Sequence, residues 1–296
     1  RSAEYRFATM FEEAPDNTSR ILRQKMNNVV GNDANGKPIY EVGDGPNIFG
    51  TDDAKMLSPD YNPMGLPKDQ VLDARSQFNT CVHSTAHAIT RRAFLAHLDE
   101  VVKQLPKERQ TVLVTCGGVA AGKDYACGKV PVVNEIVKNV GAVWNAAGEA
   151  NGTDNNWLMQ ECEKRGIKPT FVFVHANPTE TWENPKRGVV ERAGRSGRMV
   201  DARLFSDSYD HGAKNFNAFH NQHKDSGKAG FFILDNSGTD PQVLDKMPEA
   251  ALAINGEKLY AQTASFLSKA QGVKPAIRRG GSIGLRIWGQ TETAHA

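Results

Sequence analysis

The sequence predicts an α/β fold in which a parallel sheet is flanked by helices. Short apolar runs alternate with segments of helical spacing along residues 76–272, and a glycine-rich turn directly follows one of those runs. Parallel strands need long crossover connections, usually helices, so this alternation favours a parallel sheet. An irregular amino-terminal arm over residues 1–75 precedes this core, and a tail over residues 273–296 follows it.

The amino-terminal arm is predicted from its turn residues. Asn, Asp, Gly and Pro cluster at residues 31–38 and again at 58–63. These residue types favour turns over helices and strands. We therefore expect an irregular segment that wraps around the core.

Each element of the core has its own signal. Residues 85–105 carry apolar side chains at helical spacing, and Pro106 ends that helix before the first strand. We expect this helix to pack beside that strand. The remaining apolar runs and periodic segments predict strands over 111–116, 140–146, 170–175 and 229–235, and helices over 157–165, 178–203 and 259–267.

The composition argues against two classes of partner. The chain has 296 residues and a net charge of +2, which favours neither nucleic acid nor an anionic membrane. Its apolar runs are too short to span a bilayer. The chain begins at Arg1 without a charged and then apolar leader, so we expect a targeting segment to be missing from it. Four cysteines without C-x-x-C spacing are expected to be reduced thiols: Cys81, Cys116, Cys127 and Cys162.

The glycine-rich turn carries the most specific motif. Residues 117–123 follow the strand 111–116 and match G-x-x-x-x-G-K, in which backbone N–H groups converge on nucleotide phosphates and the lysine reaches the β and γ oxygens. A glycine turn without a ligand does not need that lysine. The predicted phosphate-binding residues are Gly117, Gly118, Ala120, Ala121, Gly122 and Lys123, of which Lys123 is also catalytic.

The residue after the lysine departs from the motif. A Ser or Thr hydroxyl ordinarily ligates magnesium there, but this chain has Asp124. Three interpretations stay open: the carboxylate binds magnesium directly, the loop has lost its metal ligand, or residues are missing between Lys123 and Asp124 in the printed sequence. A carboxylate beside a triphosphate is repelled unless a cation bridges the two, so Asp124 is the candidate metal ligand.

An arginine-rich segment follows the strand 170–175. A charge run of this kind is often a solvated helix face. Its position after a strand and a proline favours a lid whose arginines stabilise a transferring phosphoryl group. The candidates are Arg187 and Arg198 for catalysis and Arg192 and Arg195 for nucleotide binding, with Arg203 at the end of the segment.

Two polar residues mark the end of the strand 140–146. Asn145 and Glu149 are expected at the carboxyl edge of the sheet, where α/β folds bind ligands. Glu149 is suited to accept a proton from an attacking hydroxyl, whereas the Asn145 amide is suited only to hydrogen bonding. The alternative is a polar strand end that caps the next helix.

Two further features have weaker functional signals. His83 and His87 lie one helical turn apart, but H-S-T-A-H lacks the glutamate of a zincin, so a packing or capping role is favoured over a metal site. Residues 235–238 close the late strand as Asp-Asn-Ser-Gly, which predicts either an Asx turn or a contact with the nucleotide base.

Taken together, these motifs resemble the zeta-toxin group of P-loop kinases. The resemblance covers residues 80–260 and depends on the loop at 117–123, the arginine-rich segment and the late strand 233–237. The amino-terminal arm and the segment 144–149 look more like the AvrRxo-type type III effector kinases of plant-pathogenic bacteria. The resemblance implies a P-loop kinase core over residues 76–272.

The resemblance also implies an activity and its setting. Such kinases use ATP and Mg²⁺ to phosphorylate a sugar hydroxyl of a nucleotide metabolite: the ribose of NAD in the effector branch and a UDP-amino-sugar in zeta toxins. It implies a toxin or virulence effector restrained by a cognate antitoxin or chaperone, present in the bacterial cytoplasm before export to a host cell. Lys123 matches the P-loop lysine, and Arg187 or Arg192 with Arg198 match the lid arginines. The family's catalytic aspartate falls on or near Asn145, where this chain departs from the pattern.

Two other functions stay open. The departures at Asp124 and Asn145 are also those of a nucleotide-binding interaction protein that has lost its chemistry. The basic tail around Arg278 and Arg279 suggests a polynucleotide kinase, but the near-neutral charge and the lack of a basic patch interleaved with aromatic residues argue against one.

Overall fold

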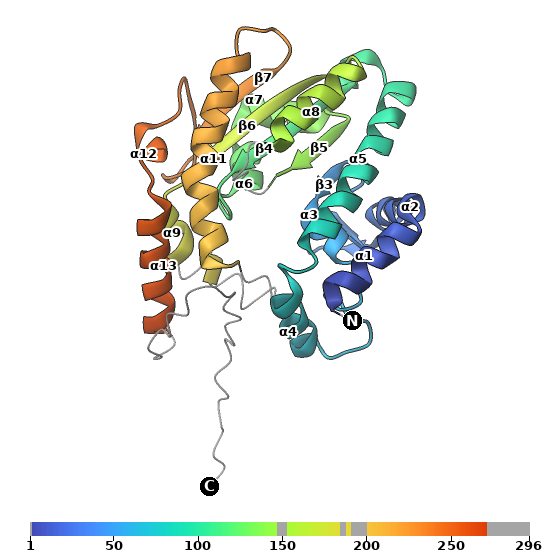
Figure 1. The fold of residues 1–296 in the computed structure, drawn as a ribbon. Helices are drawn as coiled ribbons and strands as arrows, with labels where there is room; N and C mark the ends of the chain where they lie inside the picture. Colours follow the sequence, from blue (N-terminus) through green and yellow to red (C-terminus); the bar gives the residue numbers. More distant parts are fainter. Residues whose placement is uncertain (1, 147–152, 184–187, 191–199, 271–296) are drawn as a thin grey trace.

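The structure is a computed structural model that describes residues 2–146, 153–183, 188–190 and 200–270. Its main sheet has the strand order β3-β5-β4-β6-β7-β8 (Figure 1). All neighbouring pairs are parallel except β7 with β8, which are antiparallel. The strands are β3 (Ile48–Gly50), β4 (Thr111–Gly117), β5 (Ala142–Asn145), β6 (Lys168–His175), β7 (Gly230–Asp235) and β8 (Gln242–Leu244).

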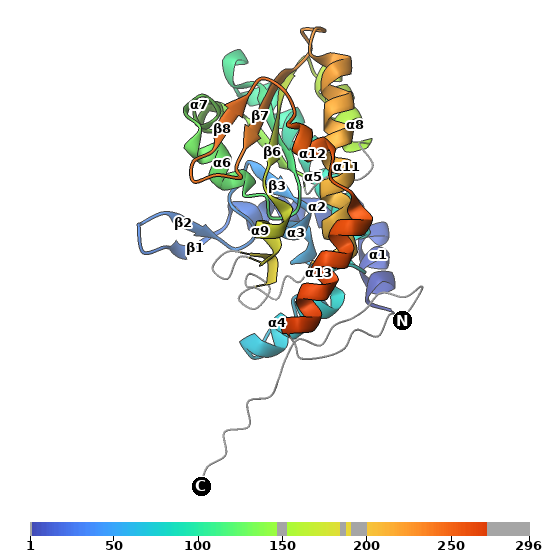
Figure 2. The ribbon, with the colours of Figure 1, turned by 90° about the vertical axis from the view of Figure 1, so that its left-hand side faces the viewer.

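Helices cover both faces of this sheet. The long α11 packs beside α13 along one side of the molecule, as the two views agree (Figures 1 and 2). The helices are α1 (Ala3–Glu13), α2 (Pro15–Asn27), α3 (Thr51–Lys55), α4 (Lys68–Phe78), α5 (His83–Gln104), α6 (Lys123–Lys129), α7 (Pro131–Asn139), α8 (Thr153–Lys164), α9 (Pro178–Glu183), α11 (Ala202–His223), α12 (Glu249–Leu252) and α13 (Gly256–Ala270).

The central strands β4, β5 and β6 are mostly apolar because both of their faces are buried. In β4, Val112 and Val114 join one core cluster with Phe94 of α5, while Leu113 joins a second cluster with Val133 of α7. Successive side chains of a strand point to opposite faces, so β4 fills both cores. This confirms a parallel sheet flanked by helices, and the helix expected over 85–105 is α5 on the β4 face.

The expectation of an irregular amino-terminal arm is wrong. Ser2 caps α1 by accepting a hydrogen bond from the Tyr5 N–H at 3.3 Å, and Pro15 opens α2. Phe7 and Leu22 then join the core cluster that contains Phe94. The turn residues do make the exposed hairpin of β1 (Val29–Asn32) and β2 (Pro38–Tyr40), which projects from the body (Figure 2).

The arm also contributes to the main sheet. β3 pairs with β5 and forms an edge of the sheet, although almost a hundred residues separate Gly50 from its partner Asn145. Because the three strands are parallel, the carboxyl end of β3 lies on the same side of the sheet as the carboxyl ends of β5 and β4. Part of the segment expected to wrap the core is thus placed where α/β folds bind ligands.

The cysteines are free thiols, as expected. Burial raises the pKa values of Cys127 and Cys162 to about 12, so both thiols are protonated and unreactive at neutral pH. None of the helices in the described residues is long and apolar enough to cross a membrane. The tail expected over residues 273–296 lies outside the described residues.

Candidate functional site

The glycine-rich loop joins β4 to α6 in a conformation that ordinary residues adopt with strain. Gly117 has a φ of 138°, Ala120 of 60° and Gly122 of 76°. Gly117 also lies close to β6, since a Cβ atom there would come within 2.3 Å of the Val174 carbonyl oxygen. The glycines adopt these φ values without strain, whereas Ala120 is strained; strain at a non-glycine residue persists only where the surroundings fix it, and it clusters at functional sites.

The surroundings of the loop come from two later elements. Ser208 of α11 accepts a hydrogen bond from the Val119 N–H at 3.1 Å, and the Tyr209 hydroxyl donates to the Val119 carbonyl at 3.2 Å. Asn236, just past β7, donates from Nδ2 to the Ala121 carbonyl at 2.9 Å. Side chains of two later elements therefore hold the middle of the loop, at Val119 and Ala121.

Residues 235–238 were predicted to form an Asx turn or to contact the nucleotide base, and the structure places Asn236 of this segment against the glycine-rich loop. The adjacent Asp235 carboxylate accepts from the Ser237 N–H at 2.9 Å, which is the predicted Asx turn. That turn, together with a backbone hydrogen bond from the Asn236 N–H to the His175 carbonyl at 2.8 Å, presents the Asn236 amide to the loop. Asn236 also lines the cavity in front of the loop.

We expect the loop to depend on the donor in the Asn236 side chain. For a nucleotide bound at the loop, as the sequence predicts, Asn236→Ala should weaken binding about fivefold, because a lost hydrogen bond is worth about 1 kcal/mol. Asn236→Asp should weaken it further, since a carboxylate of the same shape cannot donate and repels the Ala121 carbonyl. Calorimetric titration with ATP measures both. Equal affinity of the parent and both variants would contradict the role given to Asn236.

A cavity of about 740 Å³ opens in front of the loop. Its lining includes the loop from Val119 to Asp124, Asn145 at the end of β5, and Asn177 after β6. A larger hollow of about 900 Å³ lies among α1, α2 and the segment after α3, but among the described residues none of the predicted site residues lines it. The cavity at the loop is therefore the candidate site.

Most described members of the predicted site line this cavity. They are Ala120, Ala121, Gly122, Lys123, Asp124 and Asn145. Gly117 and Gly118 begin the loop and are not among the described residues that line the cavity; Gly118 packs so closely that an added Cβ would lie 2.5 Å from the Tyr209 ring. The Asn145 amide oxygen accepts from the Thr115 hydroxyl at 3.2 Å, which joins the ends of β5 and β4.

The remaining predicted residues are not placed. Glu149, Arg187, Arg192, Arg195 and Arg198 lie outside the described residues. Their roles as base and lid arginines stay predictions. Val189 and Val200, which flank most of the arginine positions in the chain, line the cavity.

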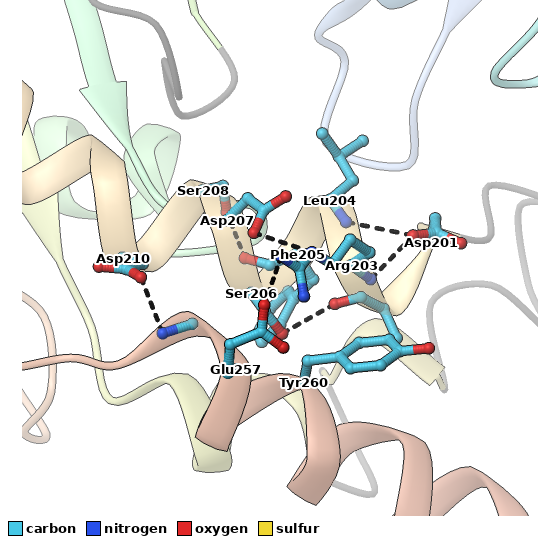
Figure 3. A network of polar contacts seen from close by, with 12 residues as sticks. Asp201, Arg203, Leu204, Phe205, Ser206, Asp207, Ser208, Asp210, Glu257 and Tyr260 are labelled. Carbon is cyan, nitrogen blue, oxygen red and sulfur yellow. Dashed lines mark hydrogen bonds and ion pairs between the residues drawn. The ribbon is translucent and has the colours of Figure 1, made fainter. Parts of the chain in front are cut away.

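Arg203 lies in the described part of the chain and has a different role from the one expected (Figure 3). Its guanidinium pairs with Glu257 of α13 at 2.7 Å and with Asp207 at 3.3 Å, and it lies 5.6 Å from the centre of the Tyr260 ring. The hydrogen bond to Glu257 raises the pKa of Arg203 and lowers that of Glu257. Arg203 therefore joins α11 to α13 and is not a lid arginine.

The wall opposite the loop was missed by sequence reasoning. It consists of the junction between β3 and α3, with Asp52, Asp53 and Lys55, and of Asn79 and His83 beside it. Lys55 is only 3% exposed, and its ammonium group pairs with Asp52 at 2.9 Å and donates to the Asn79 amide oxygen at 2.8 Å. A lysine buried this deeply requires such partners.

Of the histidine pair, His87 makes packing contacts of the kind that was favoured, whereas His83 is exposed and stacks on His87. His87 Nδ1 lies 3.2 Å from the Thr51 hydroxyl, and Nε2 lies 3.2 Å from Asp154 of α8. Partial desolvation lowers the pKa of the stacked His83 to about 4, with help from the charges of Lys55 and His87. No group of three metal-binding side chains occurs in the residues that the structure describes. His87 thus ties the β3–α3 junction to α5 and α8.

Comparison with known proteins adds little to this description. No protein-family model and no curated protein matches the chain. Among solved structures it is similar to one titled as the crystal structure of the native AvrRxo1-ORF1:-ORF2 complex, with a TM-score of 0.38 and 10% sequence identity. That match covers 68% of this chain and 78% of the other. So slight a likeness carries no argument about function, which must come from the site itself.

Proposed function

We propose that this chain is an ATP-dependent phosphotransferase that phosphorylates an alcohol hydroxyl. The observation that carries the proposal is the loop after β4, in which Ala120 has a positive φ and side chains of later elements hold Val119 and Ala121. Lys123, at the end of this loop, lines a cavity of about 740 Å³. Cavities of roughly 300–1,000 Å³ are typical of small-molecule sites. The N–H groups of Val119 and Ala121 donate to Ser208 and to the Gly118 carbonyl, so the N–H groups of other loop residues would be the ones that donate to phosphates.

The residues at the loop divide the work on the triphosphate. Lys123 is placed to neutralise negative charge that develops on the transferring group. Asp124 is exposed in the first turn of α6 and lines the cavity, so its carboxylate suits Mg²⁺, which commonly takes one or two protein carboxylates and completes its shell with phosphates and waters. Bound magnesium would supply charge neutralisation on the phosphate oxygens.

The finer assignment follows the sequence resemblance to zeta-toxin kinases. The favoured acceptor is a ribose hydroxyl of NAD, and a UDP-amino-sugar is the next candidate. We extend the proposal to a toxin or effector that is made in a bacterial cytoplasm, acts in a host cell and is restrained by a cognate antitoxin or chaperone. The resemblance in motifs supports these points, and the cavity leaves room for a substrate beside the loop.

Binding and product analysis together test the proposal. The chain is titrated with ATP and magnesium by calorimetry, then incubated with ATP and either NAD or UDP-N-acetylglucosamine, and the products are analysed by mass spectrometry. We expect binding and one added phosphate on an acceptor. Binding without ADP formation would favour the nucleotide-binding interaction protein, and no binding would overturn both functions.

Asp124 gives a separate prediction about the metal. Asp124→Ala should raise the magnesium concentration needed for half-maximal ADP formation by about tenfold or more, as the loss of metal-site groups commonly does. Asp124→Ser restores the usual hydroxyl ligand and should keep the parent dependence. Glu135→Ala is a matched control, because Glu135 lies on the exposed side of α7 beside Lys138. An unchanged magnesium dependence in Asp124→Ala would remove Asp124 from the metal site.

A further inference from the structure

The end of β3 lies within reach of the phosphate-binding loop. Gly50 is in register with Asn145 of β5, and Asn145 is in register with Thr115 of β4, two residues before the loop. Two strand spacings therefore separate β3 from β4, or about 10 Å. The residues just after Gly50 and the loop face each other across one cavity. A hydroxyl acceptor fits between them.

Phosphoryl transfer to a hydroxyl needs a group that receives the proton. Asn145 has no basic form, because an amide does not accept a proton at neutral pH. Five carboxylates line the cavity in the described part of the chain: Asp44, Asp52, Asp53, Asp124 and Glu180. Their positions distinguish them.

Most of these carboxylates have other roles or positions. Asp53 accepts a hydrogen bond from the Gly50 N–H at 3.0 Å and caps α3. Asp124 adjoins Lys123 on the nucleotide side. Asp44 is exposed in a turn, and Glu180 is exposed on α9 beyond β6, away from β3. Asp52 is the carboxylate on the wall opposite the loop that a neighbouring cation holds in place.

The surroundings of Asp52 fix its position. Its carboxylate pairs with the buried Lys55, which Asn79 holds in turn, and its side chain is 43% exposed at the cavity wall. The hydroxyl of the preceding Thr51 contacts His87, which in turn pairs with Asp154. Arg91 lies 3.9 Å from the Asp154 carboxylate. The ion pair with Lys55 holds the Asp52 carboxylate in one position, and a general base must lie within hydrogen-bond reach of the proton that it accepts.

We propose that Asp52 is the general base of the acceptor side. The inference rests on the proposed kinase function. The acceptor hydroxyl oxygen attacks the γ-phosphorus of ATP, and its proton passes to a carboxylate oxygen of Asp52. The bond between the γ-phosphorus and the β,γ-bridging oxygen breaks, and its electron pair leaves with ADP. The β3–α3 junction is thus the acceptor side of the cavity, and the loop is the nucleotide side.

Kinetics of Asp52→Asn test the proposal. The readout is ADP formation from magnesium-ATP with NAD, with UDP-N-acetylglucosamine, or with water alone as acceptor. Asp52→Asn should lower the fastest of these rates about a hundredfold, the lower range for loss of a general base, while calorimetric ATP affinity stays within about threefold. The pH profile of the residual rate should lose its acid limb, and Asp52→Glu should recover part of the rate.

Two further variants separate chemistry from folding. Asp60→Asn is the matched control, since Asp60 pairs with Arg6 elsewhere in the arm and should leave the rate unchanged. Asp53→Ala removes the oxygen that accepts from the Gly50 N–H at the start of α3 and should lower the melting temperature more than Asp52→Asn does. A parent-like rate in Asp52→Asn, or an unchanged acid limb, overturns this inference alone. Absence of ADP formation by the parent chain overturns the proposed function and the inference together.

Discussion

Lys123→Ala is expected to abolish most phosphoryl transfer. Lys123 is the first residue of α6, directly after the loop, and it lines the cavity. Its ammonium group is therefore the candidate cation for the phosphate of the nucleotide. Loss of a single preorganised group that stabilises transition-state charge costs about 10²–10³ in kcat. We expect a loss of that size in ADP formation, and a smaller loss in ATP affinity measured by calorimetry.

A second lysine of the same helix provides the control. Lys129 ends α6, is exposed, and lies 5.8 Å from the centre of the Tyr125 ring. Lys129→Ala makes the same chemical change at a residue that does not itself line the cavity, so it should keep the parent rate. A Lys123→Ala protein that phosphorylates NAD or a UDP-sugar as fast as the parent would refute the role of the loop. Lys123→Arg should not rescue, because a planar guanidinium does not replace a compact ammonium group.

The strand, glycine-rich loop and helix of the candidate site were predictable because their signals are local. The apolar run over 111–116, the glycines and Lys123 follow one another in the chain, and the structure has β4, the strained loop and α6 there. The apolar run over 170–175 likewise lies in β6, and every residue of β4 is paired with a residue of β6. Local patterns such as these fix an element before any long-range contact forms.

The opposite half of the site depends on contacts between distant residues. β3 has only three residues, Ile48–Gly50, and becomes a strand by pairing with β5. No periodic pattern identifies so short a strand, and the turn-rich composition around it predicts an irregular arm. The position of Asp52 opposite the loop follows from that pairing. Asn145 and Glu149 are the polar residues nearest to a strand that the sequence identifies, so the catalytic group of this half was predicted there.

The helix α11, which contacts the loop, has a recognisable sequence pattern. Phe205, Tyr209, Phe216 and Phe219 recur at helical spacing, and Asp201 caps the start of α11 by accepting from the N–H groups of Arg203 and Leu204. That pattern predicts α11. Its function in holding Val119 through Ser208 and Tyr209 does not follow from periodicity, because those contacts span about ninety positions of the chain.

Gly117→Ala is expected to have the largest effect on stability. At a φ of 138° the backbone is in a region that alanine adopts with strain, which costs about 1–3 kcal/mol. The new Cβ atom would also lie 2.3 Å from the carbonyl oxygen of Val174, a backbone atom of the neighbouring strand β6. Overpacking of this kind adds about 1–3 kcal/mol. We expect urea unfolding followed by circular dichroism to show a loss of about 3–5 kcal/mol, a large fraction of a typical domain's stability.

Gly128→Ala controls for the change from glycine to alanine itself. Gly128 lies in α6, eleven residues further along the chain, and an added Cβ atom there meets nothing within 4 Å. The same substitution should stabilise the protein by about 0.5–1 kcal/mol, because alanine favours the helix over glycine. If both variants unfold at the same urea concentration, the close approach of the loop to β6 has no energetic consequence. If only Gly117→Ala is destabilised and it also loses ATP binding, the contact between β4 and β6 is what sets the geometry of the phosphate-binding loop.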